Sequence, residues 1–281
     1  MTEMARLVLA PFDSGHRDRR MGAGPFDLLR HGAAELLDAD QVITVESDRP
    51  EFPQEVRTAF EVQRAVAAQV RQAVSEGSAP VVLSGNCNAT VGVVSGLSTP
   101  DDDLAVVWLD AHADLNTPET TTSGFVDGMG LSVLTGRCWA TLAGTVPGFR
   151  PVPDDQVLLV GARDLAPQER AVLAGSGIRL LPATADDVAG AALPPRVRRV
   201  HLHIDLDVHD SRLVGPANEY AVPDGPDAAE VRRIVEAVSA RFPVVSATFA
   251  AYDPAVDVDG AVRAAALDLI ELIGTRLAQN P

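Results

Sequence analysis

Two short acidic segments carry the residues best suited to chemistry. The first, Val107-Trp-Leu-Asp-Ala-His-Ala-Asp-Leu-Asn116, places Asp110, His112 and Asp114 two residues apart, directly after an apolar run. Alternate residues of an extended strand point to one face, so this spacing predicts two carboxylates and an imidazole that project together from a strand end. Burying three such groups is costly without a compensating cation. The alternative is a solvated loop that carries three polar residues.

The second segment, His201-Leu-His-Ile-Asp-Leu-Asp-Val-His-Asp210, alternates polar and apolar residues without a break. In an extended strand, this alternation predicts that the polar side chains share one face, although a half-exposed edge strand would show the same pattern. The polar residues of that face are His201, His203, Asp205, Asp207 and His209.

Two strand ends that both carry paired carboxylates favour a common metal site. The carboxylates of Asp110, Asp114, Asp205 and Asp207, flanked by His112, suit Mn²⁺ or a related first-row ion better than structural zinc. Carboxylates that bridge allow two cations to lie about 3.5–4 Å apart, the usual separation in two-metal hydrolytic sites.

Short apolar segments alternate with helical patterns along the chain. Strands are expected at residues 6–10, 41–45, 80–84, 104–109, 156–161, 178–181, 199–206 and 244–250. Helices are expected at residues 26–37, 53–76, 127–136, 167–174, 227–241 and 257–278, the second of them with Pro53 near its start and Gly77 after its end. This alternation predicts an α/β fold with helices on both faces of a parallel sheet and a ligand site at the carboxyl ends of the strands.

Length and composition limit the classes of protein. The 281 residues, 46% of them hydrophobic, suffice for one domain over residues 1–281, and no repeat or linker divides them. No apolar run reaches the roughly 18 residues of a membrane span. A net charge of −16 argues against nucleic acid and anionic membranes as partners. The chain starts with a strand pattern and not a signal peptide, and its two cysteines form no disulfide framework, so a cytoplasmic location is expected.

Five motifs across most of the chain follow the order of the motifs of one enzyme family and resemble them. Three of them correspond to metal motifs: Ser84-Gly-Asn-Cys-Asn88, Asp110-Ala-His-Ala-Asp-Leu-Asn-Thr-Pro-Glu-Thr-Thr-Thr-Ser-Gly124 and Ile204-Asp-Leu-Asp-Val-His-Asp210. Two more, Ala10-Pro-Phe12 and Gly22-Ala-Gly-Pro25, lie near the N-terminus. Together they resemble the arginase, or ureohydrolase, family, and the second metal motif resembles its arginase branch.

The resemblance implies a three-layer α/β/α domain with a mainly parallel sheet of about eight strands and two Mn²⁺ per chain. In the family pattern Asp110 and Asp205 would bridge the ions, Asp114 would complete one of them, and His112 and Asp207 would complete the other. A hydroxide shared by the ions attacks the guanidinium carbon of the substrate. The resemblance therefore implies a metal-dependent amidinohydrolase that acts on a small guanidino amino acid. The oligomeric state is not predicted.

Two residues near the expected metal centre differ from the family pattern. Cys87 stands where the first motif has a histidine ligand; a thiolate is softer than Mn²⁺ prefers, and the alternative is a small buried cysteine that fills the core. Asp127 replaces the histidine that shuttles protons to the leaving amine, and an ionised Asp is a weak acid at pH 7 unless its pKa is raised. His209 is a candidate substitute for this histidine, or else a loop residue that covers the strand end.

Two further departures concern the expected substrate pocket. Ala251 replaces the family glutamate that pairs with the guanidinium, and a methyl group cannot act as a counter-ion. Glu219, in a loop that faces the substrate in the family, is a candidate replacement, or else an ordinary exposed residue. Ala166 replaces an aspartate that binds the substrate α-amino group, and Glu169 or Asp164 is a candidate for that role.

Other residues of the family's amino-acid site are kept. Asn116 and Ser123 correspond to residues that hold the substrate α-carboxylate in the arginase branch, and Asn218 is expected to bind substrate from the loop that faces it. The changes at Cys87, Asp127 and Ala251 favour a substrate whose guanidino group is less basic and which has a better leaving group. This pattern resembles the branch that hydrolyses Nω-hydroxy-L-arginine to L-ornithine and hydroxyurea in the biosynthesis of the antibiotic D-cycloserine. A hydrolase for another guanidino or amide substrate and a non-catalytic metal-binding relative are the alternatives.

Overall fold

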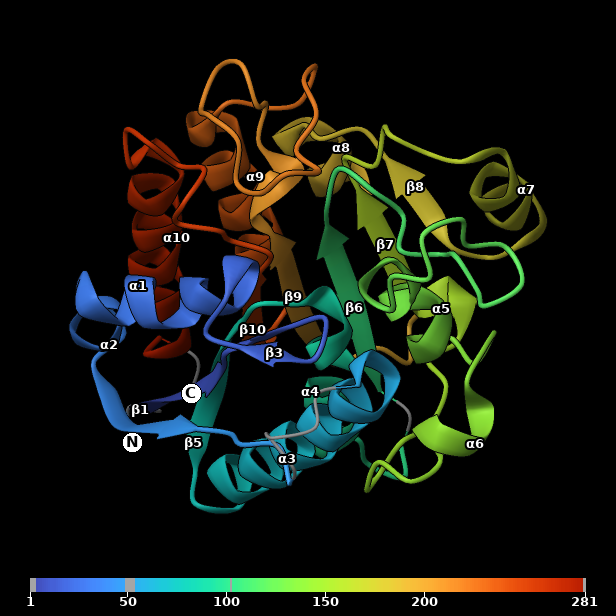
Figure 1. The fold of residues 1–281 in the computed structure, drawn as a ribbon, viewed down its shortest axis with the longest axis horizontal. Helices are drawn as coiled ribbons and strands as arrows, with labels where there is room; N and C mark the ends of the chain where they lie inside the picture. The colour runs from blue at the N-terminus through green and yellow to red at the C-terminus, as the bar shows by residue number, and fades with distance from the viewer. Residues whose placement is uncertain (1–3, 49–53, 102, 280–281) are drawn as a thin grey trace.

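A parallel β-sheet forms the centre of the computed structural model, which describes residues 4–48, 54–101 and 103–279 (Figure 1). Eight strands pair in the order β4-β1-β5-β10-β9-β6-β7-β8, and neighbouring strands are parallel. The strands are β1 (Met4–Ala10), β4 (Ala39–Thr44), β5 (Ser78–Ser84), β6 (Leu104–Leu109), β7 (Val157–Val160), β8 (Arg179–Leu181), β9 (Arg199–Asp205) and β10 (Val244–Ala250). Two short strands, β2 (Phe12–Asp13) and β3 (His16–Arg17), form a separate antiparallel pair. The expected α/β fold is confirmed.

Helices cover both faces of the sheet and complete three layers (Figure 1). One face packs against α3 (Glu55–Ser75), α4 (Thr90–Leu97) and α5 (Gly130–Leu134). The other face packs against α1 (Gly24–Arg30), α2 (Ala33–Leu36), α8 (Ala185–Gly190), α9 (Ala228–Arg241) and α10 (Ala261–Leu277). The remaining helices are α6 (Ala140–Ala143) and α7 (Pro167–Gly175). None of the helices in the described ranges is both long enough and apolar enough to cross a bilayer.

The carboxyl ends of four central strands lie side by side. β5, β10, β9 and β6 are consecutive in the sheet, and segments that follow or end them carry Cys87, Ala251, Asp205 and Asp110. Open α/β sheets bind their ligands at the carboxyl ends of the strands. The strand order therefore brings residues from distant parts of the sequence to one edge of the sheet.

Every expected helix differs from the structure at one or both ends; α7, α9 and α10 lie within four residues of the expected limits, and the other three differ as follows. The helix expected at 26–37 is divided into α1 and α2, because Gly32 between them has a φ of +99°. The helix expected at 127–136 begins with a 3₁₀ turn, Asp127–Met129, before α5. The helix expected at 53–76 is α3, and Gly77 follows its end with a φ of +79°, whereas Pro53 lies outside the described residues.

Candidate metal centre

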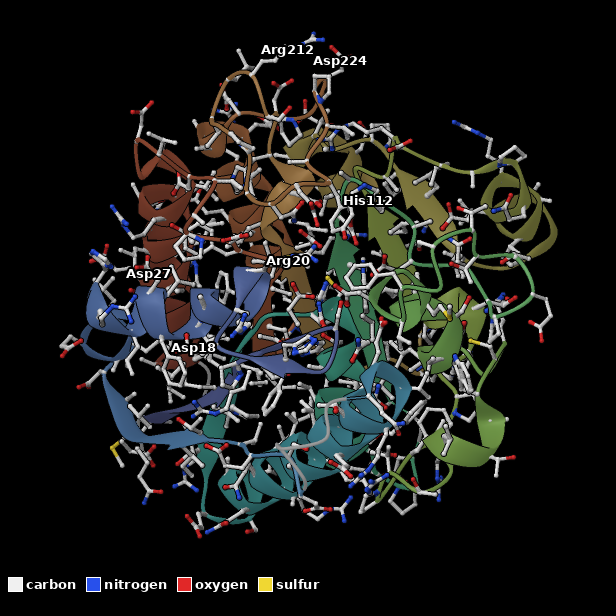
Figure 2. The ribbon with its side chains drawn as sticks, in the orientation of Figure 1. Asp18, Arg20, Asp27, His112, Arg212 and Asp224 are labelled. Atoms are coloured by element: carbon white, nitrogen blue, oxygen red, sulfur yellow. The ribbon has the colours of Figure 1, made fainter. Side chains whose placement is uncertain are left out.

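Two overlapping groups of side chains bring possible metal ligands together at the carboxyl ends of the strands. Cys87, Asp110 and His203 form the first group, and Asp110, His112 and Asp207 form the second. Within each group the possible ligand atoms all lie within 4.8 Å of one another. His112 lies near the carboxyl end of β6 (Figure 2). Asp110 belongs to both groups and therefore joins the two halves of the centre.

The loop after β6 turns around Asp110. The strand ends at Leu109, so the expected strand alternation is wrong for the three ligands that follow. Asp110 Oδ1 accepts a hydrogen bond from the His112 backbone N–H at 2.7 Å, and Oδ2 accepts one from Trp108 Nε1 at 2.9 Å. Asp114 has a φ of +50°, in the left-handed region that few residues with a Cβ adopt. These local hydrogen bonds and this turn, and not a continued strand, set the positions of the ligands.

The end of β9 brings a second pair of carboxylates to the same place. Asp205 is the last residue of β9, and its Oδ1 accepts a hydrogen bond from the Asp207 N–H at 2.8 Å across the 3₁₀ turn Leu206–Val208. Asp207 Oδ1 accepts a hydrogen bond from the Ala111 N–H at 3.3 Å. Asn218 Nδ2 donates to Asp207 Oδ2 at 3.2 Å. These contacts tie the turn after β9 to the loop after β6.

In the His112 half of the centre, which comprises His112, Asp110 and Asp207, the charges offset one another. His112 Nδ1 lies 3.4 Å from Asp110 Oδ1 and 3.3 Å from Asp207 Oδ2. Burial alone would lower the pKa of His112, but the carboxylates of Asp207 and Asp110 raise it well above its ordinary value. Burial alone would raise the pKa of Asp207, and His112 lowers it. These directions favour an imidazolium between the two carboxylates in the metal-free protein.

The Cys87 half, which comprises Cys87, Asp110, His203 and the neighbouring Asp114 and Asp205, combines acids with neutral donors. Cys87 begins a 3₁₀ turn after β5, and its buried thiol donates to Asp205 Oδ2 at 2.9 Å. Burial and the neighbouring Asp205 raise the pKa of Cys87. Burial and nearby carboxylates also raise the pKa values of Asp114 and Asp205, and burial lowers the pKa of His203. These directions favour uncharged side chains in the metal-free protein.

The donor atoms of the centre fit a divalent cation. Asp114 Oδ2 and His203 Nε2 are buried, and neither has a hydrogen-bond partner within the described part of the chain. Buried polar atoms without a partner are uncommon in folded proteins. Carboxylate, imidazole and thiolate are all ligands of first-row divalent ions. Cations bound in this centre would supply partners for such atoms and offset the charge of ionised carboxylates.

A cavity of about 170 Å³ adjoins the carboxylate cluster. Two larger surface hollows contain no member of the two ligand groups, whereas this cavity combines a concave shape with convergent polar side chains, as active sites do. Its walls comprise Met21, His112, Asp114, Asn116, Ser123, Phe125, Asp127, Gly128, Glu169, Asp205, Asp207, Asn218, Tyr220 and Ala251.

Comparisons with known proteins agree with this geometry. The profile described as the Arginase family matches residues 4–274. The chain belongs to the arginase family. It is 35% identical over 178 residues to the Nω-hydroxy-L-arginine amidinohydrolase of Streptomyces lavendulae, a match that covers 61% of this chain and 61% of that protein. It is 27% identical over 302 residues to the arginase of Bacillus subtilis, which covers 99% and 100% of the two chains. The crystal structure of the arginase from Bacillus cereus matches with a TM-score of 0.86 and 24% identity over 99% of each chain.

Family membership confirms two of the expectations from sequence. The arginase family consists of binuclear metal hydrolases, so this arginase-family chain is a metal-dependent hydrolase. The solved arginases share its three-layer α/β/α architecture with a parallel central sheet.

Several predicted substrate and catalytic residues of this arginase-family chain lie at the cavity. Asp127 is buried there, where its Oδ1 accepts a hydrogen bond from the Asn88 N–H at 3.0 Å and its Oδ2 accepts one from Asn86 Nδ2 at 2.9 Å. Burial raises the pKa of Asp127 to about 8 despite these two bonds. Asn116 and Ser123 lie on the cavity wall, and their binding of a substrate carboxylate stays a prediction.

Two predicted catalytic residues lie away from the cavity wall. β9 ends at Asp205, so His209 does not continue its polar face; His209 is buried, with its Nδ1 2.9 Å from the carbonyl oxygen of Leu206. Glu219 is exposed and pairs with Arg20. Catalytic roles for these two residues stay predictions, and the structure brings neither side chain to the ligand groups.

The candidates for the amino end of the substrate also differ in position. Glu169 is buried and lines the cavity, whereas the side chain of Asp164 is 62% exposed. Asn218 lines the cavity too, but its side-chain amide donates to Asp207 Oδ2 and to the Ala251 carbonyl oxygen. Asn218 therefore holds two parts of the cavity wall together, and its predicted contact with substrate stays a prediction.

The sequence assigned no role to three residues that surround the ligands in the structure. Trp108 donates to Asp110, Asn86 donates to Asp127, and His203 joins Cys87 in a ligand group. Trp108 precedes Asp110 by two residues, and His203 precedes Asp205 by two residues. This spacing in the strand pattern was the local sign that their side chains lie near the predicted ligands. Their contacts depend on pairing between β6 and β9, which no local pattern predicts.

Proposed function

We propose that this protein holds two Mn²⁺ ions and hydrolyses Nω-hydroxy-L-arginine to L-ornithine and hydroxyurea. The observation that carries the proposal is Ala251, which is 2% exposed in the cavity wall, where the arginase pattern has a glutamate. A methyl group cannot offset the charge of a guanidinium in a closed pocket. The electron-withdrawing oxygen makes an N-hydroxyguanidine less basic than a guanidine. Its uncharged form therefore forms more readily, and that form does not need a glutamate as counter-ion.

The backbone at Ala251 is held in an uncommon conformation. Its φ is +62°, and Asn218 Nδ2 donates to its carbonyl oxygen at 2.9 Å. A residue with a Cβ adopts the left-handed region at a cost, and such strained residues cluster at ligand sites. Neighbouring residues hold the backbone at position 251 in place. The kind of side chain at this position therefore sets the charge of the pocket wall without a change of backbone.

Other residues of the cavity wall suit the amino-acid end of the substrate. Asn116 and Ser123 offer neutral polar groups for the α-carboxylate. Glu169 offers a buried carboxylate for the α-ammonium group, and its two oxygens accept hydrogen bonds from the Leu115 N–H at 3.2 Å and the Ala166 N–H at 2.9 Å. These bonds fix the orientation of Glu169, which supports recognition of an amino acid.

The ligand set would divide between the two ions as in the family pattern. Asp110 and Asp205 would bind both ions, Cys87 and Asp114 one of them, and His112 and Asp207 the other. When bound, the ions would lower the pKa of water and so supply a nucleophile near neutral pH.

The reaction also needs a proton for the leaving amine. Water adds to the guanidino carbon, the bond from this carbon to the δ-nitrogen breaks, and the δ-nitrogen takes up a proton as ornithine leaves. Asp127 lines the cavity, and its pKa of about 8 keeps a proton on the carboxyl group near neutral pH. The hydrogen bonds from Asn86 and Asn88 fix the carboxyl group in place. This value applies to the metal-free protein. Nearby cations would lower it, which would make the protonated carboxyl group a stronger acid and leave a smaller fraction of it protonated near neutral pH.

The two kinds of relative support this substrate to different degrees. The hydroxyarginine amidinohydrolase is more similar in sequence, but its match covers 61% of this chain. The Bacillus subtilis arginase matches 99% of the chain at 27% identity. The residues at positions 87, 127 and 251 are the reason to favour hydroxyarginine over arginine.

A substrate panel tests the proposal. Protein loaded with Mn²⁺ is given Nω-hydroxy-L-arginine, L-arginine or agmatine, and ornithine, hydroxyurea and urea are measured. We expect ornithine and hydroxyurea from hydroxyarginine, with a kcat/KM at least about tenfold higher than for arginine. Ala251→Glu should shift this preference toward arginine, and Ala251→Gln, which has the same length but no charge, should not. Ornithine from arginine but none from hydroxyarginine would refute the proposal, and metal binding without any turnover would favour a non-catalytic relative.

A further inference from the structure

Two buried histidines on β9 differ in how their ring nitrogens are satisfied. His201 uses both nitrogens, because Nδ1 lies 2.6 Å from Ser246 Oγ and Nε2 lies 3.2 Å from Thr248 Oγ1. His203 uses only Nδ1, which lies 2.8 Å from Thr90 Oγ1. Its Nε2 is fully buried and has no hydrogen-bond partner among the described residues. His201 has the contacts of a core histidine, and His203 does not.

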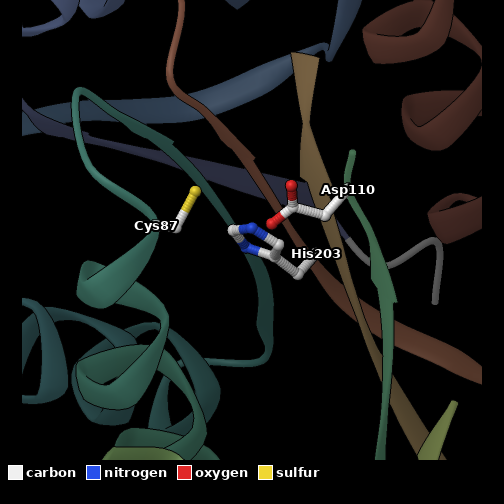
Figure 3. A group of neighbouring side chains, drawn as sticks. All are labelled: Cys87, Asp110 and His203. Atoms are coloured by element: carbon white, nitrogen blue, oxygen red, sulfur yellow. The ribbon is translucent and has the colours of Figure 1, made fainter. Parts of the chain in front are cut away.

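His203 belongs to a ligand group, and Nε2 is its ring nitrogen without a partner among the described residues. The possible ligand atoms of His203, Cys87 and Asp110 all lie within 4.8 Å of one another. Figure 3 shows these side chains converging from three different segments of the chain. One cation with bonds of about 2.0–2.3 Å to nitrogen, oxygen and sulfur would give ligand separations in this range.

Two neighbours hold the ring of His203 in place. The ring stacks on Trp108, with centroids 3.7 Å apart and planes 27° apart. Thr90 Oγ1 lies where it can accept a hydrogen bond from Nδ1–H, which leaves the lone pair on Nε2. Histidines that bind metals usually donate their second ring N–H to an acceptor of this kind, which fixes the tautomer. Trp108 also donates to Asp110 Oδ2 at 2.9 Å, so the same indole orients two members of the group.

We propose that His203 Nε2 is a metal ligand, together with Cys87 and Asp110. The assignment rests on the metal centre of the proposed function, and it adds a ligand that the family pattern of motifs does not include. The imidazole that the pattern has at position 87 is supplied here from β9. Because thiolate and imidazole are softer ligands than carboxylate, the Cys87 half should bind Co²⁺ or Zn²⁺ more readily than an all-oxygen site would.

Metal affinity of two matched variants gives the first test. His203→Gln removes the Nε2 ligand, and His201→Gln changes a buried histidine two residues away on the same strand. Mn²⁺ affinity is measured by competition with a chelator, and metal content is measured by elemental analysis. We expect His203→Gln to weaken one of the two sites at least tenfold, and His201→Gln to bind both ions as the wild type does. Wild-type affinity at both sites in His203→Gln would overturn the proposal.

Pulsed EPR gives a second test that does not depend on the folding of His203→Gln. Protein with ¹⁵N-labelled histidine and the substitution His112→Gln is loaded with less than one Mn²⁺ per chain. We expect a histidine ¹⁵N coupling to the bound ion, because His203 still supplies an imidazole. Bound Mn²⁺ without this coupling would overturn the assignment, as would a His112→Gln protein that binds no Mn²⁺ when the wild type does.

The two proposals fail in different ways. A wild-type protein that binds no divalent ion would overturn both of them. Turnover of hydroxyarginine without the ¹⁵N coupling would overturn the His203 assignment and leave the proposed function in place. The coupling without turnover of any guanidino substrate would support His203 as a ligand and overturn the proposed function.

Discussion

The two halves of the metal centre share Asp110 but balance their charges in different ways. In the His112 half, Nδ1 of His112 lies within 3.4 Å of carboxylate oxygens of Asp110 and Asp207, and their charges raise the pKa of the imidazole. In the Cys87 half, the thiol contacts Asp205 and the buried imidazole of His203 is neutral. The directions of the pKa shifts therefore favour a protonated imidazole in one half and uncharged side chains in the other.

This difference predicts how each half responds to a metal ion. Ligands bind metals in their deprotonated forms, so an ion in the His112 half must displace the proton of the imidazolium. An ion in the Cys87 half must displace protons from the thiol and from buried carboxyl groups whose pKa values are raised. The Cys87 half therefore depends more on the ion for its charged state.

Asp110→Asn should have the largest effect, because Asp110 is the one residue common to both ligand groups. Loss of its charge removes a ligand from each half, and we expect kcat/KM to fall by more than about 100-fold. Asp186→Asn is the matched control, since this exposed acid on α8 belongs to neither group. Steady-state ornithine release and metal content would be measured for both variants. Activity within tenfold of the wild type for Asp110→Asn would argue against a shared ligand.

Cys87→Ser should have the next largest effect and should be confined to one half. A hydroxyl group is a poorer ligand than a thiolate, so we expect the affinity of one metal site to fall about 10- to 100-fold while the other site is unchanged. Cys138→Ser is the control, because Cys138 is also a buried free cysteine but lies outside both ligand groups. Titration with Mn²⁺ in the presence of a chelator would measure both sites. Two sites of wild-type affinity in Cys87→Ser would show that Cys87 only fills the core.

The smallest effect concerns the pH dependence of stability in the metal-free protein. Burial raises the pKa of Asp127 from 3.8 to about 8 in the folded state. Between these values the folded protein keeps a proton that the unfolded chain loses, so the free energy of unfolding should fall as pH rises from about 4 to 8. One such group contributes up to about 1.4 kcal/mol per pH unit.

Denaturant unfolding at several pH values would measure this slope. Asp127→Asn should make the slope less steep, because the amide does not titrate. Asp186→Asn, which changes an exposed acid on α8, should leave the slope as it is. The raised pKa values of Asp110, Asp114 and Asp205 add to the slope in the same direction, and saturating Mn²⁺ should oppose it. An unchanged slope in Asp127→Asn would show that this carboxyl group is ionised across the range.

The strands were predictable from sequence because the pattern that specifies them is local. β6 and β10 have the expected limits, and the other six strands differ from expectation by one or two residues at one or both ends. α4 was not expected, because Thr90-Val-Gly-Val-Val-Ser-Gly-Leu97 is rich in β-branched residues and glycine, which disfavour helix. All of its residues are buried, and packing against α3 outweighs this weak propensity.

The candidate site, like the strands, was predictable where it depends on a local pattern of residues. The spacing of Asp110, His112 and Asp114 indicated a metal centre, although these residues follow the strand and do not continue it. The positions of His209 and Glu219 were not predictable from the motifs, because the 3₁₀ turn after β9 redirects the first and pairing with Arg20 holds the second at the surface. The single domain over residues 1–281 stays a prediction.

The sequence by itself determined which chemical groups are present and that they follow apolar strands. Such patterns are local, since hydrophobic burial and strand alternation act between near neighbours in the chain. Only the tertiary structure decided which of these groups meet. Cys87, Asp110 and His203 come from segments after β5, after β6 and within β9, and the order of strands in the sheet places them within reach of one ion. The segment with Asp110, His112 and Asp114 indicated metal ligands from sequence. The packing around it adds His203 to the candidate ligands.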